Sequence, residues 1–122
     1  MQKRLASFFL RKKQDARVIK IKVGLIANRH EGMPVQEFVY EKAINNPANK
    51  NKLQMVADNW VYKKIGEMNE KKEYGRVEVH LYSTGFTPAL ICTLNACRRV
   101  KWKVYVYCWN SEKQNYFALE VK

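Results

Sequence analysis

The chain has 122 residues, a length that suits one compact domain and hardly two. Hydrophobic residues make up 47% of it, which is enough for a packed core and excludes a disordered chain. The formal net charge is +12, and the three cysteines (Cys92, Cys97 and Cys108) have spacings that match no zinc pattern, so we expect buried, reduced thiols.

Much of the positive charge lies in the N-terminal part of the sequence. Residues 1–22 hold eight basic residues against Asp15 alone, a balance of +7, which leaves +5 for residues 23–122. A basic arm of this kind can bind nucleic acid or another polyanion. It can also be a solvated tail, and we favour this interpretation because the arm has few interleaved aromatics.

No targeting or membrane segment is expected. The apolar piece Leu5–Leu10 is shorter than the hydrophobic core of a secretory signal, and no credible cleavage site follows it. No apolar run approaches transmembrane length. We therefore expect a cytosolic protein without membrane contact, with residues 1–16 as a basic extension and residues 17–122 as a single ligand-binding domain.

The first half of that domain predicts two strands and a helix. Residues 17–27 alternate as a strand does, with one apolar face made by Ile19, Ile21, Val23 and Leu25. Residues 35–44 favour a short second strand. A helix is expected over residues 45–68, with Asn46 as its cap, Pro47 in its first turn and Gly66 at its end.

The second half predicts a strand, a helix and a hairpin. Residues 76–85 form the strand, and residues 87–99 form the helix, with Thr87 as its cap. Strands over 101–109 and 115–121 are joined by a five-residue hairpin connection. The fold class is therefore α/β (α+β): a single domain with a small mixed β-sheet and two main helices, in the order β-(β)-α-β-α-β-β.

The turn "YSTGFTP" is the best-placed candidate for binding. It links the end of a parallel strand to a helix N-terminus, where unpaired N–H groups suit phosphate. Thr84 can donate a hydrogen bond, Gly85 allows a ligand close to the backbone, and Phe86 can stack on a base. An ordinary strand-to-helix turn also needs a glycine and a capping threonine, so both interpretations remain open.

The first predicted strand ends in a second polar cluster, made by Asn28, Arg29, His30 and Glu31. If this strand runs parallel to residues 77–82, Arg29 and His30 emerge at the same sheet edge as the turn. Arginine could then bind a phosphate with its forked guanidinium. The alternative is a surface Arg–Glu pair, which contributes little.

The helix predicted over 87–99 has a second semi-apolar side. Its core face is formed by Leu90, Leu94 and Cys97, and the opposite side by Ile91, Cys92, Asn95 and Arg99. Asparagine is unfavourable inside a helix unless its side chain is used. We therefore predict a subunit contact near Asn95, with an ordinary surface asparagine as the alternative.

Catalysis is not expected. His80 lies on a predicted strand, and no nucleophile motif, carboxylate pair, metal spacing or cofactor motif is present in the sequence. His30 with Glu31 is the one candidate acid–base pair, of the kind a small nuclease would use.

Three strings of the chain resemble a known family. They are "IANRHE" followed after one residue by "MPV", then "LYSTGFTPALICTLNAC", then "VYVYCWNSEKQNYFALEV". These strings are similar to the first type of Thoeris anti-defence protein from phages, and the resemblance covers about residues 20–122.

The resemblance implies a non-enzymatic sponge in the cytoplasm of the bacterial host. Such a protein binds a cyclic ADP-ribose isomer made by a bacterial TIR-domain sensor and so keeps an NAD-degrading effector inactive. The ligand stays intact in pockets at a dimer interface, and some relatives form larger assemblies that also hold cyclic oligonucleotides. The implied ligand-binding residues are Asn28, Arg29, His30, Thr84, Gly85, Phe86 and Asn95.

The chain departs from the family pattern at two places. Gly32 lies between Glu31 and Met33, where the family pattern has no extra residue. Near the final hairpin, where some members have an arginine, the chain has Trp109, which offers an aromatic stack in place of a phosphate contact. Two alternatives remain open: a ring nuclease or phosphodiesterase that uses His30, and a nucleic-acid-binding module that uses the basic N-terminus.

Overall fold

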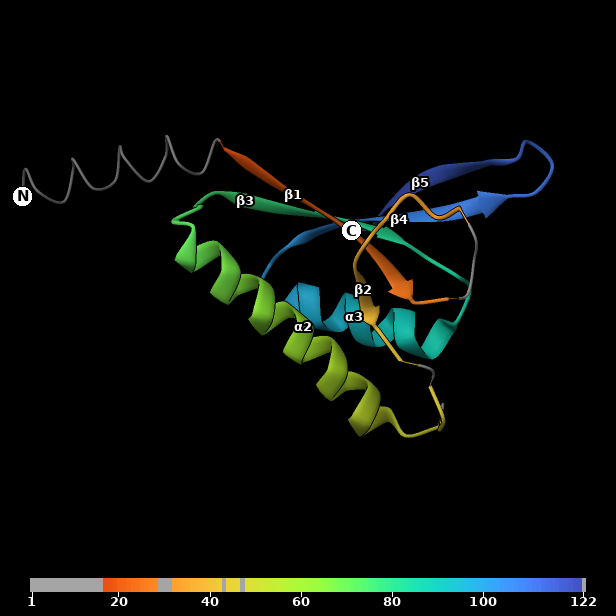
Figure 1. Cartoon of the computed structure of the whole chain (residues 1–122), viewed down its shortest axis with the longest axis horizontal. Helices are drawn as coiled ribbons and strands as arrows, with labels where there is room; N and C mark the ends of the chain where they lie inside the picture. The colour runs from red at the N-terminus through yellow and green to blue at the C-terminus, as the bar shows by residue number, and fades with distance from the viewer. Residues whose placement is uncertain (1–16, 29–31, 43, 47, 122) are drawn as a thin grey trace, which may run out of the picture.

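A computed structural model describes residues 17–28, 32–42, 44–46 and 48–121, which form a five-stranded sheet and two helices (Figure 1). The elements in chain order are β1 (Val18–Ile26), β2 (Phe38–Tyr40), α2 (Lys50–Glu70), β3 (Arg76–Tyr82), α3 (Thr87–Arg99), β4 (Lys103–Asn110) and β5 (Asn115–Val121). This confirms the predicted α+β fold and its order of elements. The extension over residues 1–16 lies outside the described residues, as do Arg29, His30 and Pro47.

The sheet has the strand order β2-β1-β3-β4-β5, and only the β4–β5 pair is antiparallel. The connections β2-α2-β3 and β3-α3-β4 both advance across the sheet in the same direction. Since parallel crossovers share one hand, two that advance the same way place their helices on the same face. Figure 1 shows this arrangement, with α2 and α3 together beneath the sheet and the other face free of helices.

The core lies between the sheet and the two helices. Alternate strand residues face the helices and are buried: Ile21, Val23, Leu25, Val77, Val79, Leu81, Val104 and Val106. Ile21, Val23 and Leu25 belong to the apolar face predicted for the first strand, whose fourth member, Ile19, is half-buried. On α2, Leu53, Ala57, Trp60 and Val61 are buried and form the apolar stripe that faces the core.

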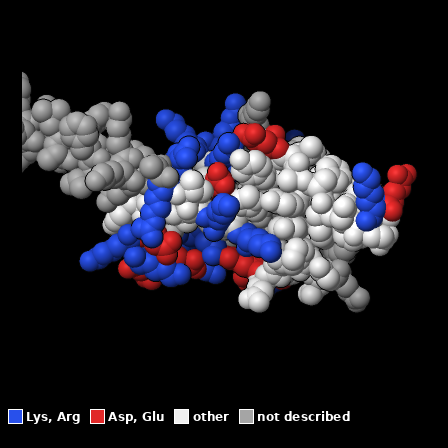
Figure 2. Space-filling view, turned by 90° about the horizontal axis from the view of Figure 1, so that it is seen from above, with Lys and Arg blue, Asp and Glu red and all other residues white. Residues whose placement is uncertain are grey.

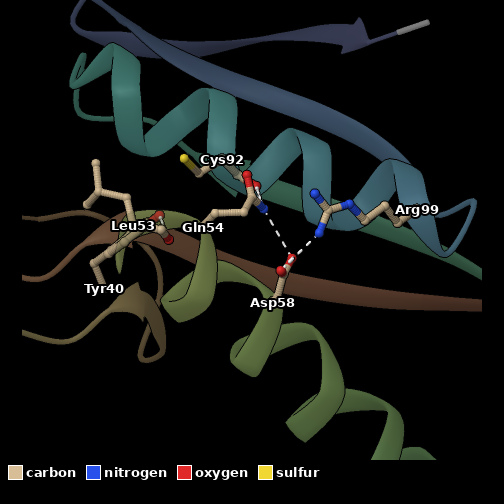
Figure 3. Close-up of polar contacts among 6 residues, drawn as sticks. All are labelled: Tyr40, Leu53, Gln54, Asp58, Cys92 and Arg99. Carbon is tan, nitrogen blue, oxygen red and sulfur yellow. Dashed lines mark hydrogen bonds and ion pairs between the residues drawn. The ribbon is translucent and has the colours of Figure 1, made fainter. Parts of the chain in front are cut away.

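A polar bridge joins α2 to α3 (Figure 3). Gln54 Nε2 donates to the carbonyl oxygen of Cys92 over 2.9 Å and to Asp58 Oδ1 over 3.0 Å. Arg99 Nη1 donates to Asp58 Oδ2 over 2.9 Å. Cys92 is therefore buried against α2, so the prediction that placed it on the outer side of its helix with Ile91 was wrong.

Two predicted helix starts are also corrected. The N-cap of α2 is Asn49, whose Oδ1 accepts from the Lys52 N–H over 3.1 Å, while Asn46 uses its side chain to bind the Ala48 N–H. The N-cap of α3 is Phe86 rather than Thr87. Gly66 does not end α2, because the helix continues to Glu70.

Gly24 of β1 provides a test of the packing between β1 and β2. A Cβ at Gly24 would lie 2.5 Å from two ring carbons of Phe38 and 2.9 Å from the sulfur of Met33. We expect Gly24→Ala to lower the free energy of unfolding by about 1–3 kcal/mol, because the Phe38 ring and the Met33 side chain must shift to admit the methyl group. Urea denaturation measures the change.

The matched control is Gly66→Ala in the exposed part of α2. A Cβ there meets no atom within 4 Å, and alanine has the higher helix propensity, so stability should rise by about 0.5–1 kcal/mol. Equal effects of the two substitutions would contradict the packing described for Gly24.

Candidate functional site

The carboxyl ends of β1 and β3 form a topological switch point. The two strands are parallel neighbours, so both end at the same edge of the sheet. The chain leaves β3 toward the helix-covered face, where α3 lies. Residues 32–37, which precede β2, run on the helix-free side instead (Figure 1). The sulfur of Met33 lies 2.9 Å from the point where a Cβ on Gly24 would project from that face. Open α/β sheets bind ligands where neighbouring strands send their connections to opposite faces.

The sequence-predicted residues that the structure describes at this edge are Asn28 and Thr84 to Phe86. Asn28 follows β1 directly, is exposed, and has a φ of 61°, a left-handed conformation that asparagine tolerates better than most residues. Arg29 and His30 continue from it and lie outside the described residues. The prediction that β1 and β3 present their polar ends at one edge is confirmed for the described part of the chain.

The turn after β3 is held by the backbone of β4. The Ser83 N–H donates to the Tyr107 carbonyl over 2.9 Å, and the Gly85 N–H donates to Ser83 Oγ over 3.2 Å. Gly85 has a φ of 84°, which favours glycine, and a Cβ there would meet nothing within 4 Å. The backbone of the turn therefore faces open space that a ligand can enter.

The start of α3 offers donors without a side-chain cap. Phe86 makes no capping hydrogen bond, and Pro88 follows in the first turn. Thr84 Oγ1 is buried and has no hydrogen-bond partner among the described residues. A helix N-terminus carries a partial positive charge, and an unpaired buried hydroxyl is costly. Together they provide an environment suited to an anionic or hydrogen-bonding ligand.

An aromatic cluster on the helix-free face extends from this edge, and of its members only Trp109 was predicted as a binding residue. Its members are His80, Tyr82, Tyr105, Tyr107, Trp109 and Tyr116. Tyr82 stacks on Tyr107 with ring centroids 4.4 Å apart, and Tyr116 contacts both Tyr82 and Trp109 edge-on at 5.0 Å. Burial raises the pKa of Tyr82 and of Tyr116. The alternating aromatics of "VYVYCW" were the available sequence signal.

His80 is a packed member of this cluster. Its ring stacks on Tyr105 at 5.1 Å, its Nδ1 shares a 2.8 Å hydrogen bond with the Tyr107 hydroxyl, and its Nε2 lies 3.5 Å from a carboxylate oxygen of Glu78. His80 lies on β3, as the prediction that placed it on a strand requires, and its ring is packed in the cluster.

The thiols have a structural environment. All three cysteines are free, Cys92 and Cys97 are buried, and Cys108 is half-buried. Burial raises the pKa of the Cys97 thiol to about 12, so it stays protonated and unreactive near neutral pH. The described residues contain no group of three His, Cys, Asp or Glu side chains able to hold a metal ion.

Asn95 lies apart from the other candidates in one copy of the chain. It is exposed on α3, more than two turns after Phe86, and lines a separate hollow of about 580 Å³. The other lining residues are either apolar (Ile91, Leu94, Trp102, Val104 and Val121) or basic (Arg98, Lys101 and Lys103). Ile91 is 51% exposed there, and the neighbouring strand exposes Phe117 and Leu119 on the same face of the sheet. We call Ile91, Asn95, Phe117, Leu119 and Val121 the α3–β5 surface.

Comparison of the chain with protein-family models, with curated proteins and with solved structures finds no match. Within the described ranges, no helix is both long and apolar enough to cross a membrane.

The unpaired hydroxyl of Thr84 leads to a prediction about the stability of the protein. Thr84→Val keeps the branched shape and removes the buried oxygen, so the free energy of unfolding should stay constant or rise by up to about 1 kcal/mol. Chemical denaturation of both proteins measures the difference.

Thr93→Val is the matched control. Thr93 is also buried, but its hydroxyl donates to the Ala89 carbonyl over 2.9 Å, so its loss should cost about 1 kcal/mol. If Thr84→Val were as destabilising as Thr93→Val, the Thr84 hydroxyl would have a partner in the folded protein.

Proposed function

We propose that this protein is a non-enzymatic sponge that binds a cyclic ADP-ribose isomer and withholds it from a bacterial NAD-degrading immune effector. In this proposal it is a phage anti-defence protein that acts in the cytoplasm of the host. The observation that carries the proposal is the unpaired Thr84 hydroxyl beside the uncapped start of α3, at the switch point of the sheet. The identity of the ligand rests on the family resemblance of the sequence.

The chemistry of the edge fits a nucleotide that contains a pyrophosphate. The Thr84 hydroxyl and the N–H groups at the start of α3 suit phosphate oxygens, and the open space at Gly85 lets the phosphate approach the backbone. Trp109, which is 37% exposed on the helix-free face, provides an aromatic ring for a purine base. Phe86 is half-buried and packs against the core. In the proposal, Asn28, Arg29 and His30 complete the site from the end of β1.

Binding without cleavage of the ligand is supported by the surroundings of His80 and of the Cys97 thiol. His80 packs against Tyr105 and bonds to Tyr107, and the Cys97 thiol is buried with a raised pKa. Neither group resembles an exposed, poised catalyst. Cleavage of the ligand through His30 remains the competing function, and the ligand experiment below separates the two.

The proposal includes a homodimer formed through the α3–β5 surface. Phe117, Leu119 and Val121 lie on the helix-side face of the sheet, yet they are 44%, 53% and 38% exposed. β5 is an edge strand, and a contiguous exposed apolar patch on such an edge is typical of a subunit contact. A second copy would cover this patch and bring Asn95 into the interface.

The ligand prediction uses calorimetry followed by recovery of the ligand. The protein should bind a cyclic ADP-ribose isomer, and heat denaturation should release it intact, as judged by mass spectrometry. Thr84→Val, Arg29→Ala and Asn95→Ala should each weaken binding about 5- to 50-fold, because each loses a hydrogen bond or charge contact of roughly 1–2.5 kcal/mol.

Thr93→Val serves as the control, since its hydroxyl is bonded inside the core, away from the sheet edge. Recovery of a linearised product would favour the nuclease. Wild-type affinity in all three site variants would reject the site.

The dimer prediction uses Leu119→Glu, which places a charge in the centre of the α3–β5 surface. Light scattering should show the wild-type chain at twice its 14.4 kDa and the variant at 14.4 kDa. Ala118→Glu is the matched control, because Ala118 is exposed on the opposite face of the same strand. A wild-type monomer, or equal dissociation of both variants, would argue against this interface.

A further inference from the structure

The charge of the chain is concentrated in a few segments. Residues 17–20, 71–76 and 98–103 hold nine basic residues against Glu73 alone, a balance of +8. Residues 1–16 carry five basic residues and Asp15, a balance of +4. These two balances add up to the total of +12, so the residues outside residues 1–16 and the three segments have no net charge. We call the nine residues the basic pole: Arg17, Lys20, Lys71, Lys72, Arg76, Arg98, Arg99, Lys101 and Lys103.

The three segments meet at one end of the molecule, where β1, β3 and β4 begin. The Arg76 N–H donates to the Arg17 carbonyl over 2.9 Å, and Lys103 pairs in register with Glu78 of β3. Residues 75–78 and 100–103 line one hollow of about 300 Å³. Figure 2, which looks onto the helix-free face, shows Lys and Arg gathered toward this end, on the left, while the half toward the β4–β5 hairpin is mostly uncharged.

Most of the basic pole is free to bind an anion. All nine side chains are exposed, and among the described residues only Arg99 and Lys103 form ion pairs, with Asp58 and Glu120 respectively. The negative end of the α3 dipole accounts for basic residues such as Arg98 and Arg99. It does not account for those that begin the strands, such as Arg17 and Arg76.

Two lysines of the pole occupy positions that glycine would fill at lower cost. Lys72 and Lys101, in the connections after α2 and α3, have φ values of 53° and 61°. The left-handed conformation penalises a residue with a Cβ, and helix ends commonly use glycine there. The chain places a charged residue at both positions despite this cost, which points to a use for the charge.

We propose that the basic pole binds the phosphate backbone of double-stranded nucleic acid, without preference for base sequence. A duplex presents closely spaced phosphates that can engage several of the seven unpaired cations at once. Membrane insertion is not supported, because Val18 and Tyr74 are the only exposed large hydrophobic residues within the three described segments. The same scarcity of aromatics disfavours a single strand, which needs rings for stacking.

The basic pole is separate in space from the proposed nucleotide site. The basic pole lies at the amino ends of β1, β3 and β4, and Asn28 and Thr84 follow the carboxyl ends of β1 and β3. A protein that uses both ends can hold a nucleotide signal while it is bound to a duplex.

The test measures the affinity of the full-length chain for a labelled 20-base-pair DNA duplex by fluorescence anisotropy, at several salt concentrations. We expect the logarithm of the association constant to fall linearly with the logarithm of salt concentration. Lys72→Gly with Lys101→Gly should reduce the slope by about 2 and weaken binding roughly 60-fold at 0.1 M salt, since each phosphate contact contributes about 0.9 to the slope. The thermal unfolding midpoint of this variant should be unchanged or raised, which separates lost binding from lost folding.

Two control variants, each with a pair of substitutions outside the basic pole, test whether the duplex binds at the pole. Lys50→Gln with Lys113→Gln removes two exposed charges outside the pole, and it should leave affinity within about threefold of wild type. Lys12→Gln with Lys13→Gln removes two charges from the N-terminal arm. The proposal is overturned if the glycine pair binds like wild type, if either control pair weakens binding as much as the glycine pair, or if phosphatidylserine vesicles are bound while the duplex is not.

Discussion

The parallel pairing of β1, β3 and β4 determines where both helices and the candidate ligand edge lie. Parallel neighbours need long crossover connections, and these connections share one hand. Because the chain advances from β2 to β3 and then to β4 in the same direction, α2 and α3 both cover one face. The step from β1 to β2 goes the other way, so its connection runs on the opposite face. The switch point between β1 and β3 follows directly from this reversal.

Three surfaces follow from the same arrangement. At the carboxyl edge, the switch point joins Asn28 to the turn at Thr84. At the far side of the sheet, the antiparallel strand β5 extends beyond the cover of α3 and exposes apolar side chains such as Leu119. At the amino edge, the two helix-to-strand connections end at the starts of β3 and β4, β3 lies beside the start of β1, and basic residues of these three segments form the basic pole. A small domain with two helices on one face thus separates a candidate ligand edge, an apolar edge and a cationic end.

Much of this fold was predictable because periodicity is a local signal. The apolar face of β1 and the bounds Asn115–Val121 of β5 match the sequence predictions, since alternation over seven or more residues is unambiguous. The start of α2 was placed too early, because Asn46 and Asn49 both have capping chemistry and only the fold decides between them. Cys92 was placed on the wrong side of α3, because a helical wheel does not show where a second helix packs.

The candidate site was only partly predictable, for a physical reason. Strand ends and turn residues are visible in the sequence, so the common edge of Asn28 and Thr84 could be predicted once parallel pairing was assumed. The stack of Tyr82 on Tyr107 depends on the register between β3 and β4, which sequence alone does not supply. The unpaired state of the Thr84 hydroxyl likewise needs the three-dimensional surroundings of the turn.

Amide and indole chemical shifts can show whether the proposed ligand binds at the switch point between β1 and β3. A chain of 14.4 kDa is well suited to a titration of the ¹⁵N-labelled protein with a cyclic ADP-ribose isomer. We expect saturable shifts at Asn28, at the turn from Ser83 to Gly85 and at the Trp109 indole, with the amides at the amino ends of β1 and β3 unchanged. Shifts confined to residues away from this edge, or no shifts at millimolar ligand, would contradict it.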